Sequence, residues 1–68
     1  MAAHHLMVGA VVFANEETIL ISDGTLFLVP AGMRLPHYPA GTTLVIEYEI
    51  LKGRNVLAHV PEIEGEAS

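Results

Sequence analysis

The sequence predicts an all-β fold, a small five-stranded barrel of the OB-like or SH3-like kind with one long loop between its third and fourth strands. Two turn signals, Asp23-Gly24 and Lys52-Gly53, each separate short runs of β-branched and apolar residues. A segment rich in proline and glycine, residues 30–41, lies between these two hairpins. No helical periodicity extends beyond a single turn, and there are no internal repeats.

Residues 6–13 are predicted to form the first strand, because they are apolar on both faces and too few for an amphipathic helix. Gly9 lies inside this run and indicates a bend or bulge, of the kind that lets a long strand curl around a small barrel. The polar residues 14–17 then form a turn into the first hairpin.

The first hairpin, residues 18–29, is centred on Asp23-Gly24, a dipeptide typical of two-residue turns. Successive side chains of a strand point to opposite faces, so a two-residue turn places one wholly apolar set toward the core. That set is Ile19, Ile21, Leu26 and Leu28. The opposite, mixed face carries Thr18, Leu20, Thr25, Phe27 and Val29.

Residues 30–41 form the predicted long loop, with three prolines and two glycines. We expect Leu35 and Tyr38 to turn inward on a single helical turn and to close one end of the barrel. Long irregular loops in compact domains often carry function. The loop is therefore a candidate ligand-binding segment, with Met33, Arg34, His37 and Tyr38 as its candidate ligand residues.

Residues 42–50 alternate between apolar and mixed positions, which predicts a fourth strand. Its core-facing residues are Leu44, Ile46, Tyr48 and Ile50. After the Lys52-Gly53 turn, the predicted fifth strand, residues 55–60, directs Val56, Ala58 and Val60 inward and Leu57 and His59 outward. We expect a single barrel domain over residues 1–60 and a disordered acidic tail over residues 61–68.

The composition excludes several classes of protein. With 68 residues and no cysteine, the chain is one small domain without disulfides or a thiolate zinc site. Three basic residues against eight acidic ones give a net charge of −5, which disfavours nucleic acid as a partner. The apolar run of residues 6–14 is too short for a membrane span and follows no basic residues, so neither membrane association nor a signal peptide is expected.

The order of these signals resembles the DUF1344 family of small bacterial β-barrel proteins. The resemblance covers residues 8–60 and rests on five segments, Val-Gly-Ala-Val-Val, Ile-Leu-Ile-Ser-Asp-Gly-Thr, Leu-Val-Pro, Pro-Ala-Gly-Thr-Thr-Leu-Val-Ile-Glu-Tyr-Glu and Lys-Gly-Arg-Asn-Val-Leu-Ala. It implies a periplasmic location if a leader has been removed, since most members of the family are secreted; otherwise the expected location is cytoplasmic. It implies no activity and no cofactor.

Metal binding is the most concrete chemical alternative. The imidazole and thioether side chains of this short chain would suit copper, and they are His4, His5, His37, His59, Met7 and Met33. A site built from Met33 and His37 would make the protein a small copper-handling protein. The competing interpretation is that the histidines are solvated and the methionines fill gaps in the packing.

Catalysis has less support in the sequence. Glu47 and Glu49 share one strand face, which we interpret as a solvated face with Arg54 as a cross-strand partner. We find no nucleophile beside a base, no acid–base pair and no glycine-rich phosphate loop, so we expect the protein not to be an enzyme.

The surplus of apolar residues favours an interaction module. After one face of each strand fills the core, seven apolar residues remain on the opposite face as a candidate interface: Val11, Phe13, Leu20, Phe27, Val29, Val45 and Leu57. Contiguous apolar surface of this kind is typical of partner-binding sites. We therefore predict a homo-oligomer, with a symmetric dimer favoured, or a module that docks to a protein or a small ligand. The competing interpretation is that the long loop and the tail cover both faces of so small a barrel.

Overall fold

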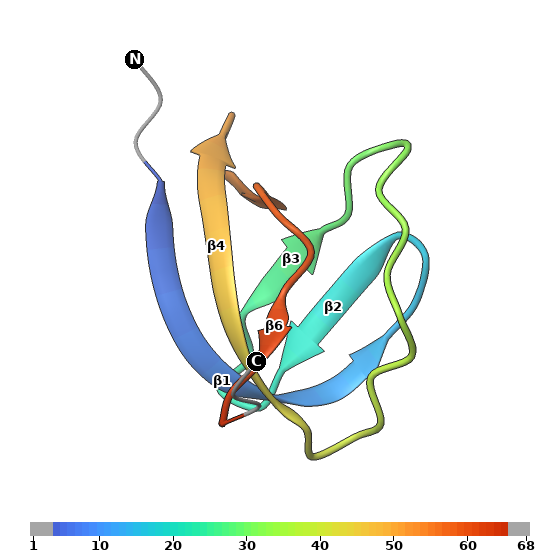
Figure 1. Cartoon of the computed structure of the whole chain (residues 1–68). Helices are drawn as coiled ribbons and strands as arrows, with labels where there is room; N and C mark the ends of the chain where they lie inside the picture. The colour runs from blue at the N-terminus through green and yellow to red at the C-terminus, as the bar shows by residue number, and fades with distance from the viewer. Residues whose placement is uncertain (1–3, 66–68) are drawn as a thin grey trace.

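The computed structural model describes residues 4–65, and this part of the chain contains strands and no helix. Figure 1 shows a ribbon curled around one interior, with the loop of residues 30–42 passing beside β2 and β3. The six strands are β1 (His5–Ala14), β2 (Thr18–Ile21), β3 (Leu26–Leu28), β4 (Thr43–Leu51), β5 (Arg54–Leu57) and β6 (Glu62–Ile63).

Five of these strands close into a barrel, which confirms the predicted fold class. The strand order is β1-β2-β3-β5-β4, and a pairing between β4 and β1 completes the ring. Only the β3–β5 pair is parallel; the other pairs in the described chain are antiparallel. This order is consistent with the predicted small barrel of the OB-like or SH3-like kind. The short β6 is an additional strand on β4.

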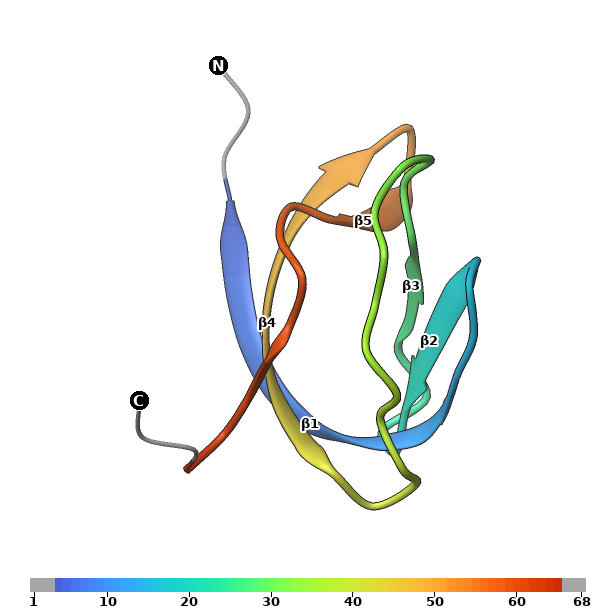
Figure 2. The ribbon, with the colours of Figure 1, turned by 45° about the vertical axis from the view of Figure 1, so that its right-hand side comes forward.

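The long first strand forms part of both sides of the barrel (Figure 2). Its first half, from His5 to Ala10, pairs with β4, and its second half pairs with β2 from Val11 onward. The register shifts between Val11 and Phe13, so the bulge lies beyond Gly9. Gly9 has a different role: a Cβ atom there would lie 2.4 Å from Cγ2 of Ile21, so glycine permits the close approach of β2.

The β2–β3 hairpin differs from the prediction by one residue. Ile19 pairs with Phe27 and Leu20 with Leu26, and the Ile21 N–H donates to the Thr25 carbonyl at 2.9 Å. The loop therefore contains three residues, with Gly24 at φ 94° as the left-handed residue of a bulged turn. A slip of one residue exchanges the two faces of a strand.

The exchange of faces corrects the predicted core of this hairpin. Phe27 is fully buried beside Ile19, whereas Leu26 is 45% exposed. Leu28 is half-buried, because it lies on the same face as Leu26. The expectation that Leu26 and Leu28 fill the core and that Phe27 faces outward is therefore wrong.

The β4–β5 hairpin confirms the predicted Lys52-Gly53 turn. Both residues have positive φ, 53° and 77°, as a two-residue turn of the favoured hairpin type requires. The register places Leu57 opposite Tyr48, so both side chains share one face. Leu57 is accordingly buried, and the prediction that it points outward while Val60 points inward is wrong.

The core combines residues from all five strands of the barrel with one residue of the long loop. Its buried members are Val11, Ile19, Ile21, Phe27, Tyr38, Leu44, Ile46 and Leu57. Tyr48 packs against this cluster, with its ring edge-to-face on Phe27 at a centroid distance of 5.0 Å. Leu44 and Ile46 were predicted to face the core and do so, whereas Ile50, at the end of β4, is 53% exposed.

The long loop and the segment after β5 are joined by Tyr38. Its ring is buried, as predicted, and its hydroxyl donates a hydrogen bond to the carbonyl of Pro61. Leu35 packs partly buried against the core, but the predicted helical turn is not formed. The structure describes residues 61–65 of the predicted tail, where Pro61 is buried and β6 pairs with β4, so the sheet continues beyond residue 60. Residues 66–68 of the predicted tail lie outside the described residues.

Tyr38→Phe is expected to lower the free energy of unfolding by about 1 kcal/mol, because the Pro61 carbonyl loses its donor. Burial also raises the pKa of Tyr38 above its ordinary value of 10.0. The unfolded chain therefore releases this proton at lower pH than the folded chain, and the stability held by the protonated hydroxyl is lost as pH rises above 10.0. Urea unfolding of the wild type and of Tyr38→Phe, below and above this pH, should show that the free energy of unfolding falls more steeply with rising pH in the wild type. Equal slopes would contradict the prediction.

Candidate interaction surfaces

The predicted interface divides between the core and the surface. Val11, Phe27 and Leu57 are at most 3% exposed, so these three residues are unavailable to a partner. Their burial follows from the strand register described above. Phe13 is 45% exposed, and the remaining members of the predicted set are half-buried: Leu20, Val29 and Val45.

A row of apolar side chains crosses three strands on the outside of the barrel. Phe13 of β1 pairs with Leu20 of β2, and Leu20 pairs with Leu26 of β3. In the next row Leu28 of β3 lies beside Val56 of β5. We call the part of this surface on β1, β2 and β3 the three-strand face: Phe13, Leu20, Leu26 and Leu28. The sequence reasoning missed Leu26, Leu28 and the adjacent Val56, because the outward direction of each depends on the true hairpin register.

A second apolar surface lies where β1 extends beyond β2. Leu6 is 71% exposed and Val8 is 52% exposed on the outer side of this half-strand. The Ala10 carbonyl accepts a hydrogen bond from Ser22 at the end of β2, so Ala10 directs its backbone groups away from β4. The direction of the backbone N–H and C=O groups alternates from residue to residue along an antiparallel strand. Those of Leu6 and Val8 therefore point to the same side as those of Ala10, away from β4. We call residues 6–8 the β1 edge.

No strand of the described chain pairs with this side of residues 6–8, because β2 ends at Ile21, opposite Val11. The β1 edge therefore combines exposed apolar side chains with backbone N–H and C=O groups that lack a partner strand.

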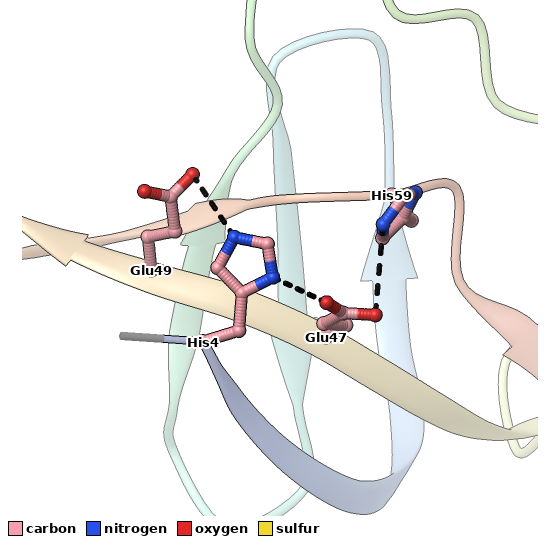
Figure 3. Close-up of polar contacts among 4 residues, drawn as sticks. All are labelled: His4, Glu47, Glu49 and His59. Atoms are coloured by element: carbon pink, nitrogen blue, oxygen red, sulfur yellow. Dashed lines mark hydrogen bonds and ion pairs between the residues drawn. The ribbon is translucent and has the colours of Figure 1, made fainter. Parts of the chain in front are cut away.

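Histidine and glutamate side chains cluster next to this edge (Figure 3). The His4 ring lies between two carboxylates of β4: its Nδ1 contacts Glu47, and its Nε2 is 3.8 Å from Oε2 of Glu49. The Nε2 of His59, after β5, is 3.6 Å from Oε1 of Glu47. Each histidine carries charge only when it is protonated, so each contact is an ion pair only in that form.

The cluster corrects one predicted pairing. Val56, and not Arg54, lies opposite Glu49 in the β4–β5 register, and Arg54 lies opposite Leu51. The glutamate face therefore has histidine partners. Residues 4–65 contain no group of three or more histidine, aspartate or glutamate side chains arranged to hold a metal ion.

The four candidate ligand residues of the long loop do come together. Met33, Arg34, His37 and Tyr38 line one open hollow, whose other wall is formed by residues 14–17 between β1 and β2. Tyr38 is buried, Met33 is half-buried, and Arg34 and His37 are exposed. The lining of the hollow thus includes two exposed basic side chains as well as Glu16 and Glu17.

Comparisons with known proteins identify no relative: no protein-family model, no curated protein and no solved structure matches this chain. The resemblance to the DUF1344 family therefore stays a prediction. Within residues 4–65, the structure has no helix that is long and apolar enough to cross a membrane.

Proposed function

We propose that this protein is a non-enzymatic β-barrel interaction module that self-associates, with a dimer as the favoured assembly. The observation that supports the proposal is the amount of apolar surface left outside a filled core. Among residues 4–65, nine large apolar side chains are at least 36% exposed: Leu6, Val8, Val12, Phe13, Leu26, Ile50, Leu51, Val60 and Ile63. Association between copies removes such surface from water, which is favourable in proportion to the apolar area buried.

The polar clusters support a role in binding more than a role in catalysis. His4, Glu47 and His59 lie on an outer strand face, where water competes for every contact. General acid–base catalysis relies on groups held in a site that shifts their protonation toward the working pH. A surface cluster of this kind is better suited to stabilising the start of β1 against β4.

Self-association is tested by measuring mass against concentration. Sedimentation velocity and light scattering of the tag-free full chain, from about 1 µM to about 1 mM, should show a shift from monomer toward dimer. The same shift should weaken little in high salt, because burial of apolar surface drives it. A monomer at every concentration would overturn the proposal.

Addition of copper or zinc is expected to leave the mass and assembly of the metal-stripped protein unchanged. The copper-handling alternative, built on Met33 and His37, requires the opposite result. Native mass spectrometry after addition of Cu(I), Cu(II) and Zn(II) distinguishes the two. Uptake of one metal per chain in the wild type, lost in His37→Ala, would favour the alternative.

A further inference from the structure

We infer that a second copy of this chain pairs with the β1 edge as an antiparallel strand, so that the two barrels share one continuous sheet. The inference rests on the proposed self-association and names its interface. Its basis is the presence, on residues 6–8, of unpaired backbone groups together with two exposed apolar side chains.

The β1 edge is the part of the described barrel that lacks the usual protection of free strand edges. Closing a barrel removes most free edges, and the β1–β4 pairing closes this barrel. Residues 6–8 keep a free edge because β2 pairs with β1 only from Val11 onward. The other free edge belongs to β6, which is only two residues long. It contains Glu62, and Glu64 follows directly after the strand. Short length and charge are both features that prevent edge-to-edge pairing. β1 is ten residues long and has no Asp, Glu, Lys or Arg.

The β1 edge is complementary to itself, which favours a second copy as the partner. In an antiparallel pair related by a twofold axis at Met7, Leu6 of one copy lies opposite Val8 of the other. The backbone N–H and C=O of both residues are then satisfied in both copies. The arrangement is closed, because each copy uses the same edge once, so it produces a dimer and not a fibre.

The surroundings of the β1 edge favour the same pairing. Val45 and Val60 lie beside Leu6 on the outside of the barrel, and they extend the apolar surface that the second copy would cover. Glu47 is opposite Leu6 on β4, and its carboxylate contacts His4 and His59 of the same copy. The paired strands themselves contain no Asp, Glu, Lys or Arg, so no such charges oppose each other between the two copies of β1.

The size of the β1 edge determines the strength of the dimer. Two apolar side chains and one short strand pair per copy make an interface at the small end of the range for protein complexes. The dimer is therefore expected to dissociate on dilution, with a dissociation constant in the range of about 1 µM to about 1 mM.

The decisive experiment compares Val8→Pro with Val8→Thr in the full chain. Proline removes the Val8 N–H, which points away from β4, and a strand edge accepts proline at such a position. Threonine keeps the N–H, the branched shape and the strand propensity. By sedimentation velocity, Val8→Pro should weaken the dimer at least about tenfold, and Val8→Thr should stay within about threefold of the wild type.

Two further variants keep the test decisive. Circular dichroism first establishes whether Val8→Pro is folded; if it is not, Leu6→Lys replaces it, because a lysine on a strand edge opposes pairing without removing a backbone group. Leu26→Asp disrupts the three-strand face and should leave the dimer intact. A wild-type dimer that survives in folded Val8→Pro or Leu6→Lys, or that is lost in Leu26→Asp, overturns the β1 edge but not self-association. A monomeric wild type overturns self-association itself.

Discussion

Replacing Phe27 with alanine is expected to lower the free energy of unfolding by about 3–5 kcal/mol, enough to unfold much of the population of a domain this small. Phe27 is 0% exposed, lies on the central β3 strand and packs edge-to-face on Tyr48. Its truncation removes the largest of the fully buried side chains and leaves a cavity that the surrounding strands cannot collapse to fill. Thermal and urea denaturation followed by circular dichroism measure the loss.

Leu26→Ala is the matched control, because Leu26 is the neighbour of Phe27 and points to the opposite face. It is 45% exposed, and its replacement should cost less than about 1 kcal/mol. Comparing the two variants therefore tests the register of the β2–β3 hairpin. A larger loss in Leu26→Ala than in Phe27→Ala would indicate a two-residue Asp23-Gly24 turn and would contradict the structure.

The hairpin shows where prediction from sequence ends. Asp-Gly marks a reversal of the chain, but it fits both a two-residue turn and a three-residue turn whose last residue is the glycine. The two differ by one residue in register, and that residue decides whether Phe27 or Leu26 enters the core. Apolar side chains occur on both faces of β3, so the pattern alone cannot choose between them.

The second hairpin could have been predicted more fully. Lys52-Gly53 is a two-residue turn, which places Leu51 opposite Arg54 and therefore Tyr48 opposite Leu57. Because directly opposed residues share a face, the inward direction predicted for Tyr48 already required Leu57 to point inward. Assigning β5 from its own alternation, without the turn, led to the wrong face.

The candidate surfaces depend on contacts between segments far apart in the chain. The β1 edge exists because β1 is ten residues long and β2 only four, a mismatch that no local pattern encodes. His4 meets Glu47 across 43 residues, and Tyr38 meets Pro61 across 23. The inward direction of Tyr38 was predicted from the sequence, but the residue that accepts its hydrogen bond was not.

Gly9→Ala is expected to lower the free energy of unfolding by about 1–3 kcal/mol, the usual cost of forcing an extra carbon into a packed core. The added Cβ would lie 2.4 Å from Cγ2 of Ile21, and Ile21 is 1% exposed, so neither strand can yield without moving the β1–β2 pair. Alanine otherwise suits a strand better than glycine, because it restricts the unfolded chain. The expected sign of the change therefore depends on this single contact.

A double-mutant cycle with Ile21→Leu isolates the contact. Leucine keeps the size of the side chain but lacks the methyl group on Cβ that meets residue 9, so it relieves the clash while it costs less than about 1.5 kcal/mol alone. Gly9→Ala should then be tolerated better in the Ile21→Leu background than in the wild type, and the coupling should be at least about 0.5 kcal/mol. Additive losses in urea unfolding would show that Gly9 is required for the bend of β1 and not for the approach of Ile21.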